Sequence, residues 1–112
     1  MPVIIEISKD EVKAIIQGEL DHHNAGAIRK SIDESVERLR PKLLKIDFSQ
    51  VSFMDSSGIG LIMGRYNTMQ LIGGEVEVDN PPPAINKILK ISGIQKLAKI
   101  KITEEEQKWV CQ

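Results

Sequence analysis

Two kinds of apolar spacing alternate along this chain, and their order is what most restricts the fold. Near the start, Val3, Ile5 and Ile7 occupy every second position, and residues 12–16 repeat that spacing. A two-residue period is typical of strands, because successive side chains of a strand point to opposite faces of a sheet. Residues 28–39 instead carry apolar side chains three or four positions apart, which is the spacing of an amphipathic helix. The alternation predicts an α/β fold with one shared core.

The rest of the chain continues this alternation. Further strands are predicted at residues 44–48, 76–78 and 97–102, and helices at 25–40, at 57–71, from the prolines at 81–83 to residue 92, and after residue 103. The predicted order is β-β-α-β-α-β-α-β-α, in a single domain over residues 1–112. The first two strands form an antiparallel hairpin, and helical crossovers make the others parallel. We therefore expect a mixed, mostly parallel sheet with its helices largely on one face.

A few residues are expected to shape these elements locally. Asn24 is placed to cap the first helix, and Gly18 marks a bend or bulge near the end of the second strand. Gly60 and Gly64 lie four residues apart on the second helix, so they share one face of it. We expect that face to pack closely against the sheet. Thr103 and Glu106 form a capping box, which predicts the last helix.

Composition and charge argue against several classes of function. The 112 residues hold 15 basic and 16 acidic side chains, interleaved along the chain, with a net charge of −1. A nucleic-acid-binding protein would gather positive charge on one surface. No apolar run approaches the roughly 20 residues of a membrane span, and no signal-peptide pattern opens the chain. Cys111 is the sole cysteine, so no internal disulfide can form. We expect a cytoplasmic protein that binds neither nucleic acid nor membrane.

Residues 52–60, Ser-Phe-Met-Asp-Ser-Ser-Gly-Ile-Gly, are the most informative segment for function. Ser56 and Ser57 stand where an apolar strand gives way to a helix. Such a position displays a serine beside unpaired backbone N–H groups and the positive end of a helix dipole. The segment therefore suits a serine that is reversibly phosphorylated. A serine before a helix is most often only an N-cap, but two consecutive hydroxyls exceed what capping needs.

Catalysis and metal binding fit the sequence less well. The residue types of a hydrolase triad are present, as Ser56 or Ser57, His22 or His23, and Asp21 or Asp55. The nucleophile-elbow pattern is absent, however, and so small a chain leaves little material for a substrate pocket. We expect no enzyme and no catalytic residue. Residues 21–23 do not predict a metal site, because adjacent histidines are expected to point apart and no third ligand follows at a suitable spacing.

The glycines of the second helix superficially match a dinucleotide-binding fingerprint. Gly58, Gly60 and Gly64 follow a strand and open a helix, and Asp79 ends the next strand about 20 residues on. Asp55 would repel a pyrophosphate in that turn, and too little chain follows for a second nucleotide half. Close packing of the helix explains the glycines better, so no cofactor is expected.

The loop at residues 21–23 should lie near the serine turn. Both segments follow predicted strands, and the carboxyl ends of parallel strands gather at one edge of a sheet. Asp21, His22 and His23 are therefore expected to share one surface with Ser56. Loop hydrogen bonding and contact with a partner are the expected roles of the histidines.

The stretch Gly-Glu-Leu-Asp-His-His at residues 18–23, together with residues 52–60 and Gly-Arg-Tyr at 64–66, closely resembles the sporulation anti-sigma factor antagonists. These are stand-alone STAS domains of endospore-forming bacteria. The resemblance continues through residues 72–75 and 91–93 and covers nearly the whole chain. The Asp-Ser-Ser-Gly turn alone marks STAS antagonists broadly. The Glu-Leu-Asp-His-His stretch points to the sporulation branch. The prolines at 81–83 depart from the family pattern.

The resemblance implies regulation by partner switching. A family member binds an anti-sigma factor, which is also a serine kinase, and so frees a sporulation sigma factor. The kinase uses ATP to phosphorylate the antagonist, and a metal-dependent phosphatase restores it, so ATP is only the kinase's substrate. The phosphoacceptor falls on Ser56, and Asp21 matches an acidic loop residue implicated in binding. The residues expected in or beside the partner surface are Asp21, His22, His23, Asp55, Ser57, Gly58 and Arg65.

Two alternatives remain open at this stage. The chain could be a STAS accessory module that docks within another signalling assembly without being phosphorylated. It could also be a small nucleotide-binding protein, although the glycine spacing is the only feature that favours this.

Overall fold

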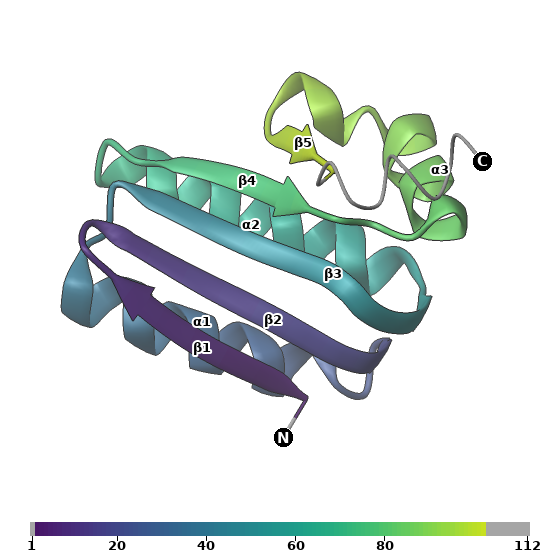
Figure 1. Ribbon diagram of the computed structural model, residues 1–112, viewed down its shortest axis with the longest axis horizontal. Coiled ribbons are helices and arrows are strands. Elements are labelled where there is room, and N and C mark those ends of the chain that lie inside the picture. Colours follow the sequence, from purple (N-terminus) through teal and green to yellow (C-terminus); the bar gives the residue numbers. More distant parts are fainter. Residues whose placement is uncertain (1, 103–112) are drawn as a thin grey trace.

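The computed structural model describes residues 2–102, which form one five-stranded sheet with three helices (Figure 1). The strands are β1 (Val3–Ser8), β2 (Glu11–Leu20), β3 (Leu43–Met54), β4 (Glu75–Asp79) and β5 (Lys99–Lys101). The helices are α1 (Ala25–Leu39), α2 (Ser56–Leu71) and α3 (Pro83–Ser92), followed by a short 3₁₀ helix, η1 (Ile94–Lys96). The predicted order of elements is confirmed as far as β5. The predicted last helix lies outside the described residues.

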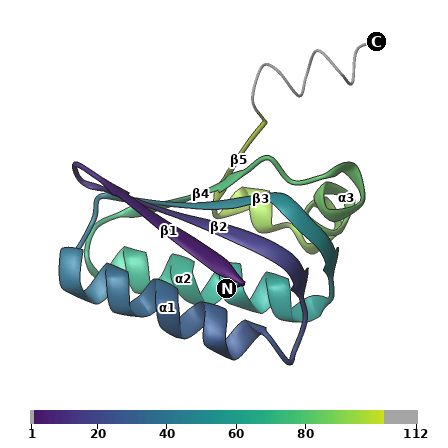
Figure 2. The ribbon, with the colours of Figure 1, turned by 60° about the horizontal axis from the view of Figure 1, so that its bottom comes forward.

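The strands follow one another across the sheet in the order β1-β2-β3-β4-β5. The β1–β2 pair is antiparallel, and each of the other pairs is parallel. The helices α1 and α2 lie side by side beneath one face of the sheet (Figure 2). The predicted mixed, mostly parallel sheet with helices largely on one face is therefore confirmed. In the described part of the chain, no helix is long and apolar enough to cross a membrane.

The core lies between that face of the sheet and the two helices. Up to the bulges, alternate residues of β2 and β3, like those of β4, are apolar and buried there, as in Ile16, Ile46 and Val78. The helices contribute the complementary apolar stripe, including Ile32 from α1 and Ile62 from α2. Burial of such side chains contributes about 1.5–3 kcal/mol each, so the sheet and the two helices stabilise one another.

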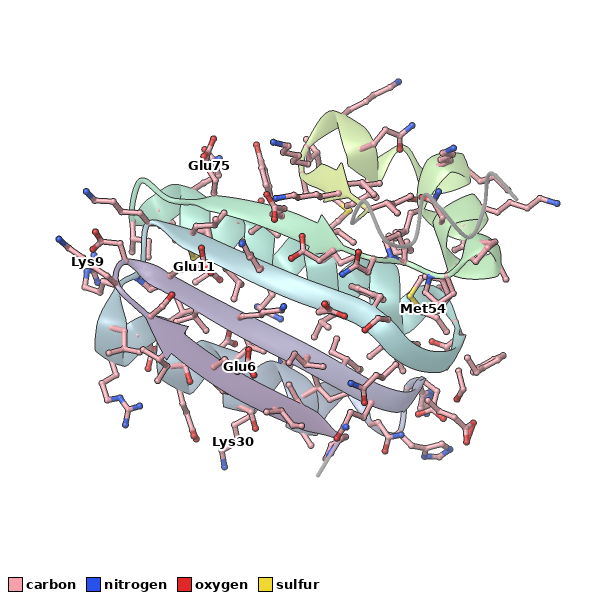
Figure 3. All side chains as sticks on the ribbon, in the orientation of Figure 1. Glu6, Lys9, Glu11, Lys30, Met54 and Glu75 are labelled. Carbon is pink, nitrogen blue, oxygen red and sulfur yellow. The ribbon has the colours of Figure 1, made fainter. Side chains whose placement is uncertain are left out.

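The opposite face of the sheet carries mostly charged side chains, among them Glu6 and Glu11 (Figure 3). Ion pairs cross between strands on this face. The Lys13 ammonium lies 3.7 Å from an Asp47 carboxylate oxygen, and the Lys45 ammonium lies 3.5 Å from Glu11. The Asp47 side chain is buried and the other three are partly exposed. Partly exposed pairs contribute modest energy, but they explain why a strand can alternate apolar and charged residues.

Two irregularities in the β2–β3 pairing confirm the predicted bulge near Gly18. The register shifts between Ile15 and Gln17 and again between Gly18 and Glu19. Gly18 has φ of 81°, a conformation that a residue with a Cβ rarely adopts. Beyond the bulges, the two strands pair again up to Leu20 and Met54. The two loops that follow these residues are thereby brought together at one edge of the sheet.

Candidate functional site

The serine turn joins the end of β3 to the start of α2. Asp55 is the N-cap residue of α2, and its carboxylate accepts the backbone N–H of Ser57 at 2.8 Å. Ser56 is the first residue of the helix and is exposed, whereas Ser57 is half-buried. Capping is thus performed by Asp55, which leaves the exposed Ser56 hydroxyl available for another role.

Asp55 is ionised in this turn at neutral pH. The backbone N–H of Ser57 has the largest effect and lowers the pKa of the Asp55 carboxyl, and burial opposes it. The Ser57 hydroxyl and His22 contribute smaller effects that also lower this pKa. The negative charge of Asp55 therefore stands beside Ser56. A phosphate on Ser56 would feel this charge together with the positive end of the α2 dipole.

Gly58 allows the turn to pack against the sheet. A Cβ at Gly58 would overlap the side chain of Met54 and would come within 3.2 Å of Leu20. Met54 is the last residue of β3 (Figure 3) and is buried. The small residue therefore lets α2 begin directly against the ends of β2 and β3.

The Asp21 loop adjoins the serine turn, as the sequence predicted. The backbone N–H of Asp55 donates to the carbonyl of Leu20 at 3.3 Å, so the two turns are hydrogen-bonded at their start. The Asp21 carboxylate accepts the backbone N–H groups of His23 and Asn24, both at 3.0 Å and both on Oδ1. Its Oδ2 makes no hydrogen bond to the described residues, which leaves that atom for an external cation.

The prediction that Asn24 is the N-cap residue of α1 is confirmed, although its side chain makes no capping hydrogen bond. Its amide instead donates to the carbonyl of Glu19 at 3.0 Å. The carboxylate of Asp21 takes the N–H groups at this turn instead. The local pattern does not distinguish the two residues, because both can accept hydrogen bonds from backbone N–H groups two or three positions on.

His22 and His23 are exposed, and their rings contact each other, with centroids 4.8 Å apart and planes tilted by 46°. The expectation that the two side chains point apart is therefore wrong. Within residues 2–102, no group of histidine, cysteine, aspartate or glutamate side chains is arranged to hold a metal ion.

Arg65 joins the two helices behind the serine turn. Its side chain is buried, and its Nε lies 2.8 Å from an Asp33 carboxylate oxygen on α1. The N–H of Nε is not aligned for a hydrogen bond, so the contact is ionic. Burial lowers the pKa of the Arg65 guanidinium, and the Asp33 charge opposes that shift. Whether Arg65 also meets a partner stays a prediction.

The prediction that Gly60 and Gly64 pack against the sheet is wrong. A Cβ at either position would meet nothing within 4 Å. Both glycines face away from the sheet, into a trough of about 350 Å³ between α1 and α2. Apolar residues surround most of α2, so the sequence pattern did not define which side faces the core. Gly58 is the glycine of this helix that makes a close contact.

A cluster of buried acids on the uncovered face of the sheet was not predicted. Glu77 and Asp79 of β4 are each only 7% exposed, and Asp47 of β3 is paired with Asp79 in register. Burial, followed by a hydrogen bond with Glu77 and repulsion from it, raises the pKa of Asp79 to about 7, while Lys45 opposes the shift. Acids that alternate with valine in a strand normally indicate a solvated face, so no sequence signal marked this cluster.

The fold and the site define a small α/β domain whose serine turn adjoins an acidic loop at the carboxyl edge of a mixed sheet. The chain belongs to the STAS domain family, whose model matches residues 4–107.

Individual relatives agree with this assignment. An anti-sigma F factor antagonist of Paenibacillus polymyxa is 36% identical over 85 residues, which cover 76% of this chain and 73% of the relative. The unphosphorylated form of the anti-sigma factor antagonist SpoIIAA has a TM-score of 0.79 at 32% identity, covering 94% of this chain and 91% of that one. The phosphorylated form of SpoIIAA, a Bacillus cell fate determinant, has a TM-score of 0.72 at 31% identity, covering 98% and 99%.

The structure brings the predicted site residues to one surface, with one exception. Asp21, His22, His23, Asp55 and Ser57 lie around Ser56, and Gly58 supports them from below. Arg65 is instead buried behind this surface, in its ion pair with Asp33. The trough beside Ser57 is the part of this surface that sequence reasoning missed.

Proposed function

We propose that this STAS domain is an anti-sigma factor antagonist. It binds an anti-sigma factor that is also a serine kinase, and binding releases a sporulation sigma factor. The observation that carries the proposal is Ser56, which is exposed at the start of α2 and stands next to the Asp21 loop. The relatives named as anti-sigma factor antagonists support it. No catalysis by the domain itself is required.

Phosphorylation of Ser56 by the bound kinase, with ATP as the kinase's substrate, would end the interaction. The phosphate adds about −1.5 to −2 charges next to the ionised Asp55. The N-terminus of α2 can accept this charge within the domain. A partner surface packed over Ser56 must desolvate it, which weakens the complex. A metal-dependent phosphatase would then restore the active form.

Asp21 is proposed as the main polar anchor of the partner. Its Oδ1 is used by the loop, and its Oδ2 remains for an arginine or lysine of the anti-sigma factor. His22, His23, Ser57 and Gly58 would complete the contact around Ser56.

The test is to incubate the purified protein with a sporulation-type anti-sigma factor kinase and ATP, and to map phosphate by mass spectrometry. Phosphate is expected on Ser56 in the unmodified protein, none in Ser56→Ala, and normal incorporation in Ser57→Ala. Ser57→Ala is the matched control because it keeps the backbone N–H that binds Asp55. Phosphate on Ser57, or none at all, would contradict the assignment of Ser56 as the phosphoacceptor.

A further inference from the structure

A trough runs along the outer side of α1 and α2, directly beside the serine turn. Its walls and floor come from Ala25 and Arg29 of α1 and from Ser57, Gly60, Leu61, Gly64 and Arg65 of α2. Because Ser57 lines one end, the trough is continuous with the surface around Ser56. A volume of about 350 Å³ is enough for one or two side chains.

Two glycines keep this trough open, and the fold needs neither of them. Gly60 and Gly64 lie inside a regular helix, without the positive φ that requires glycine at other positions of this chain. Apart from the backbone of α2 itself and the two adjacent residues, no described atom lies within 4 Å of a Cβ built at either position. Glycine destabilises a helix interior relative to alanine. Their presence therefore costs stability without any packing gain, which points to a surface that must remain free of side chains.

The trough also carries more positive than negative charge. Arg29 is exposed on one wall, and Arg65 is buried at the other. Both charged side chains that line the trough are therefore arginines. Asp33 forms an ion pair with Arg65 Nε, and Asp55 accepts the backbone N–H of Ser57, but neither carboxylate lines the trough. The adjacent N-terminus of α2 adds partial positive charge.

We propose that this trough receives an aspartate or glutamate side chain of the anti-sigma factor. The carboxylate would pair mainly with Arg29, and the side chain would pack against Gly60 and Gly64. The inference rests on the proposed function and deepens it. An extended segment of the partner that crosses α1 and α2 would cover the trough and Ser56 at once. Shape and charge both fit such a segment, because glycines admit close approach and an arginine can bind a carboxylate through two N–H groups.

This placement also explains how phosphorylation would release the partner. A carboxylate seated beside Ser57 would be near the phosphate of phosphorylated Ser56, and both would depend on the same positive field at the start of α2. Like charges close together in a desolvated interface repel strongly. Phosphorylation would therefore act on a specific partner side chain as well as on the interface in general.

The experiment measures the dissociation constant of the full chain for a sporulation-type anti-sigma factor by titration calorimetry. Gly60→Ala should raise the melting temperature and yet weaken binding about tenfold. Arg29→Gln should weaken binding about three- to tenfold, and Arg29→Lys less. Lys30→Gln is the matched control, since Lys30 is exposed on α1, does not line the trough and projects outward (Figure 3).

The outcomes separate the two proposals. If the unmodified protein does not bind the anti-sigma factor, the proposed function fails, and this inference fails with it. If it binds and Gly60→Ala and Arg29→Gln bind equally well, only the trough inference is overturned. Calorimetry with inorganic phosphate tests separately whether the trough binds a free anion. Micromolar binding of free phosphate that Arg29→Gln abolishes would show an independent anion site, and would overturn the assignment to a partner carboxylate.

Discussion

The carboxylate of Asp55 accepts the backbone N–H of Ser57 at 2.8 Å, so the helix that displays Ser56 starts on a fixed negative charge. The backbone N–H of Asp55 donates to the carbonyl of Leu20 at 3.3 Å, which holds this residue next to the Asp21 loop. One residue thus caps α2, orders the turn and sets the electrostatic surroundings of the proposed phosphorylation site.

Replacement of Asp55 should lower stability in a pH-dependent way. Asp55→Ala removes the cap and is expected to lower the melting temperature at pH 7 by a few degrees. The pKa of Asp55 is lower in the folded chain than its ordinary value of 3.8. Its contribution is therefore complete above about pH 4 and is lost as the pH falls through the lowered pKa.

Thermal unfolding at pH 7 and pH 3 checks this prediction. The difference between Asp55→Ala and the unmodified protein should shrink at the lower pH. Asp55→Asn serves as the control, because an amide can still cap the helix without carrying charge. A difference that does not change with pH would contradict the electrostatic part of the argument.

Two glycines of α2 should respond in opposite ways to the same substitution. Gly58→Ala places a methyl group against the buried side chain of Met54, and we expect a loss of about 1–2 kcal/mol of unfolding free energy. Gly60→Ala meets open space, and we expect a gain of about 0.5–1 kcal/mol. Urea unfolding of both variants measures the two values. Equal effects would mean that helix propensity alone governs these positions.

The alternation of strand and helix spacing was sufficient to predict the order of elements and the mixed sheet, because each period depends on local backbone geometry. The serine turn was also predictable, since Asp55, Ser56 and Gly58 lie within four residues at one junction of strand and helix. The side of α2 that meets the core could not be predicted, because apolar side chains surround most of this helix. Gly60 has no side chain, so its residue type does not indicate what it contacts. Periodicity shows which residues share a face but not what that face meets.

Contacts between distant residues were also beyond the sequence pattern. The position of Asp33 within α1 gives no local sign of a partner, yet it pairs with Arg65 on α2. Glu77 and Asp79 looked like the solvated half of a strand, yet both are buried. These contacts depend on how separate helices and strands are placed relative to one another. The residues around each position give no local signal of that placement.

The ion pair between Asp33 and Arg65 should stabilise the folded state only while both partners are present. Asp33→Asn leaves a buried guanidinium without its counter-charge, and we expect a loss of about 1–2 kcal/mol, less than for a fully buried pair because the Asp33 side chain is 35% exposed. Arg65→Met should remove most of that penalty when the two changes are combined. A double-mutant cycle in urea measures the coupling. Glu34→Gln, an exposed neighbour, should change stability by less than about 0.5 kcal/mol.

Asp79 should make the folded state less stable as the pH rises towards neutrality. Its pKa is about 7 in the folded chain and 3.8 as the ordinary value, so the folded state holds a proton that the unfolded chain has released. Stability therefore falls as the pH rises between about 4 and 7. Asp79→Asn removes this dependence and should stabilise the protein at pH 8 by on the order of 1 kcal/mol, reduced by the nearby Lys45.

Urea unfolding at pH 5 and pH 8 tests the role of Asp79. The gain from Asp79→Asn should be clearly larger at pH 8 than at pH 5. Glu75→Gln is the matched control, because Glu75 is an exposed acid at the start of the same strand. If the two variants show the same pH profile, the cluster around Asp79 does not hold a proton.

Phosphorylation of Ser56 should change binding and leave the fold intact. The N-terminus of α2 favours an anion at an exposed position by about 0.3–1 kcal/mol. Repulsion from Asp55 opposes this gain, and solvent screens exposed charges over about 8–10 Å. The two effects are similar in size, so the phosphorylated and unmodified proteins should melt within a few degrees of each other.

In the complex the balance differs, because the partner expels the water that solvates the phosphate. The penalty should appear mainly as faster dissociation.

Ser56→Ala should bind the anti-sigma factor and resist release by ATP, and Ser56→Asp should bind more weakly, although one carboxylate carries less charge than a phosphate. Asp21→Asn should also weaken binding while its amide oxygen still accepts the loop N–H groups. The measurements are the melting temperatures of the phosphorylated and unmodified proteins and their dissociation rates from the anti-sigma factor by surface plasmon resonance. A large fall in melting temperature on phosphorylation would show that the switch works by a change of shape rather than by charge at the surface.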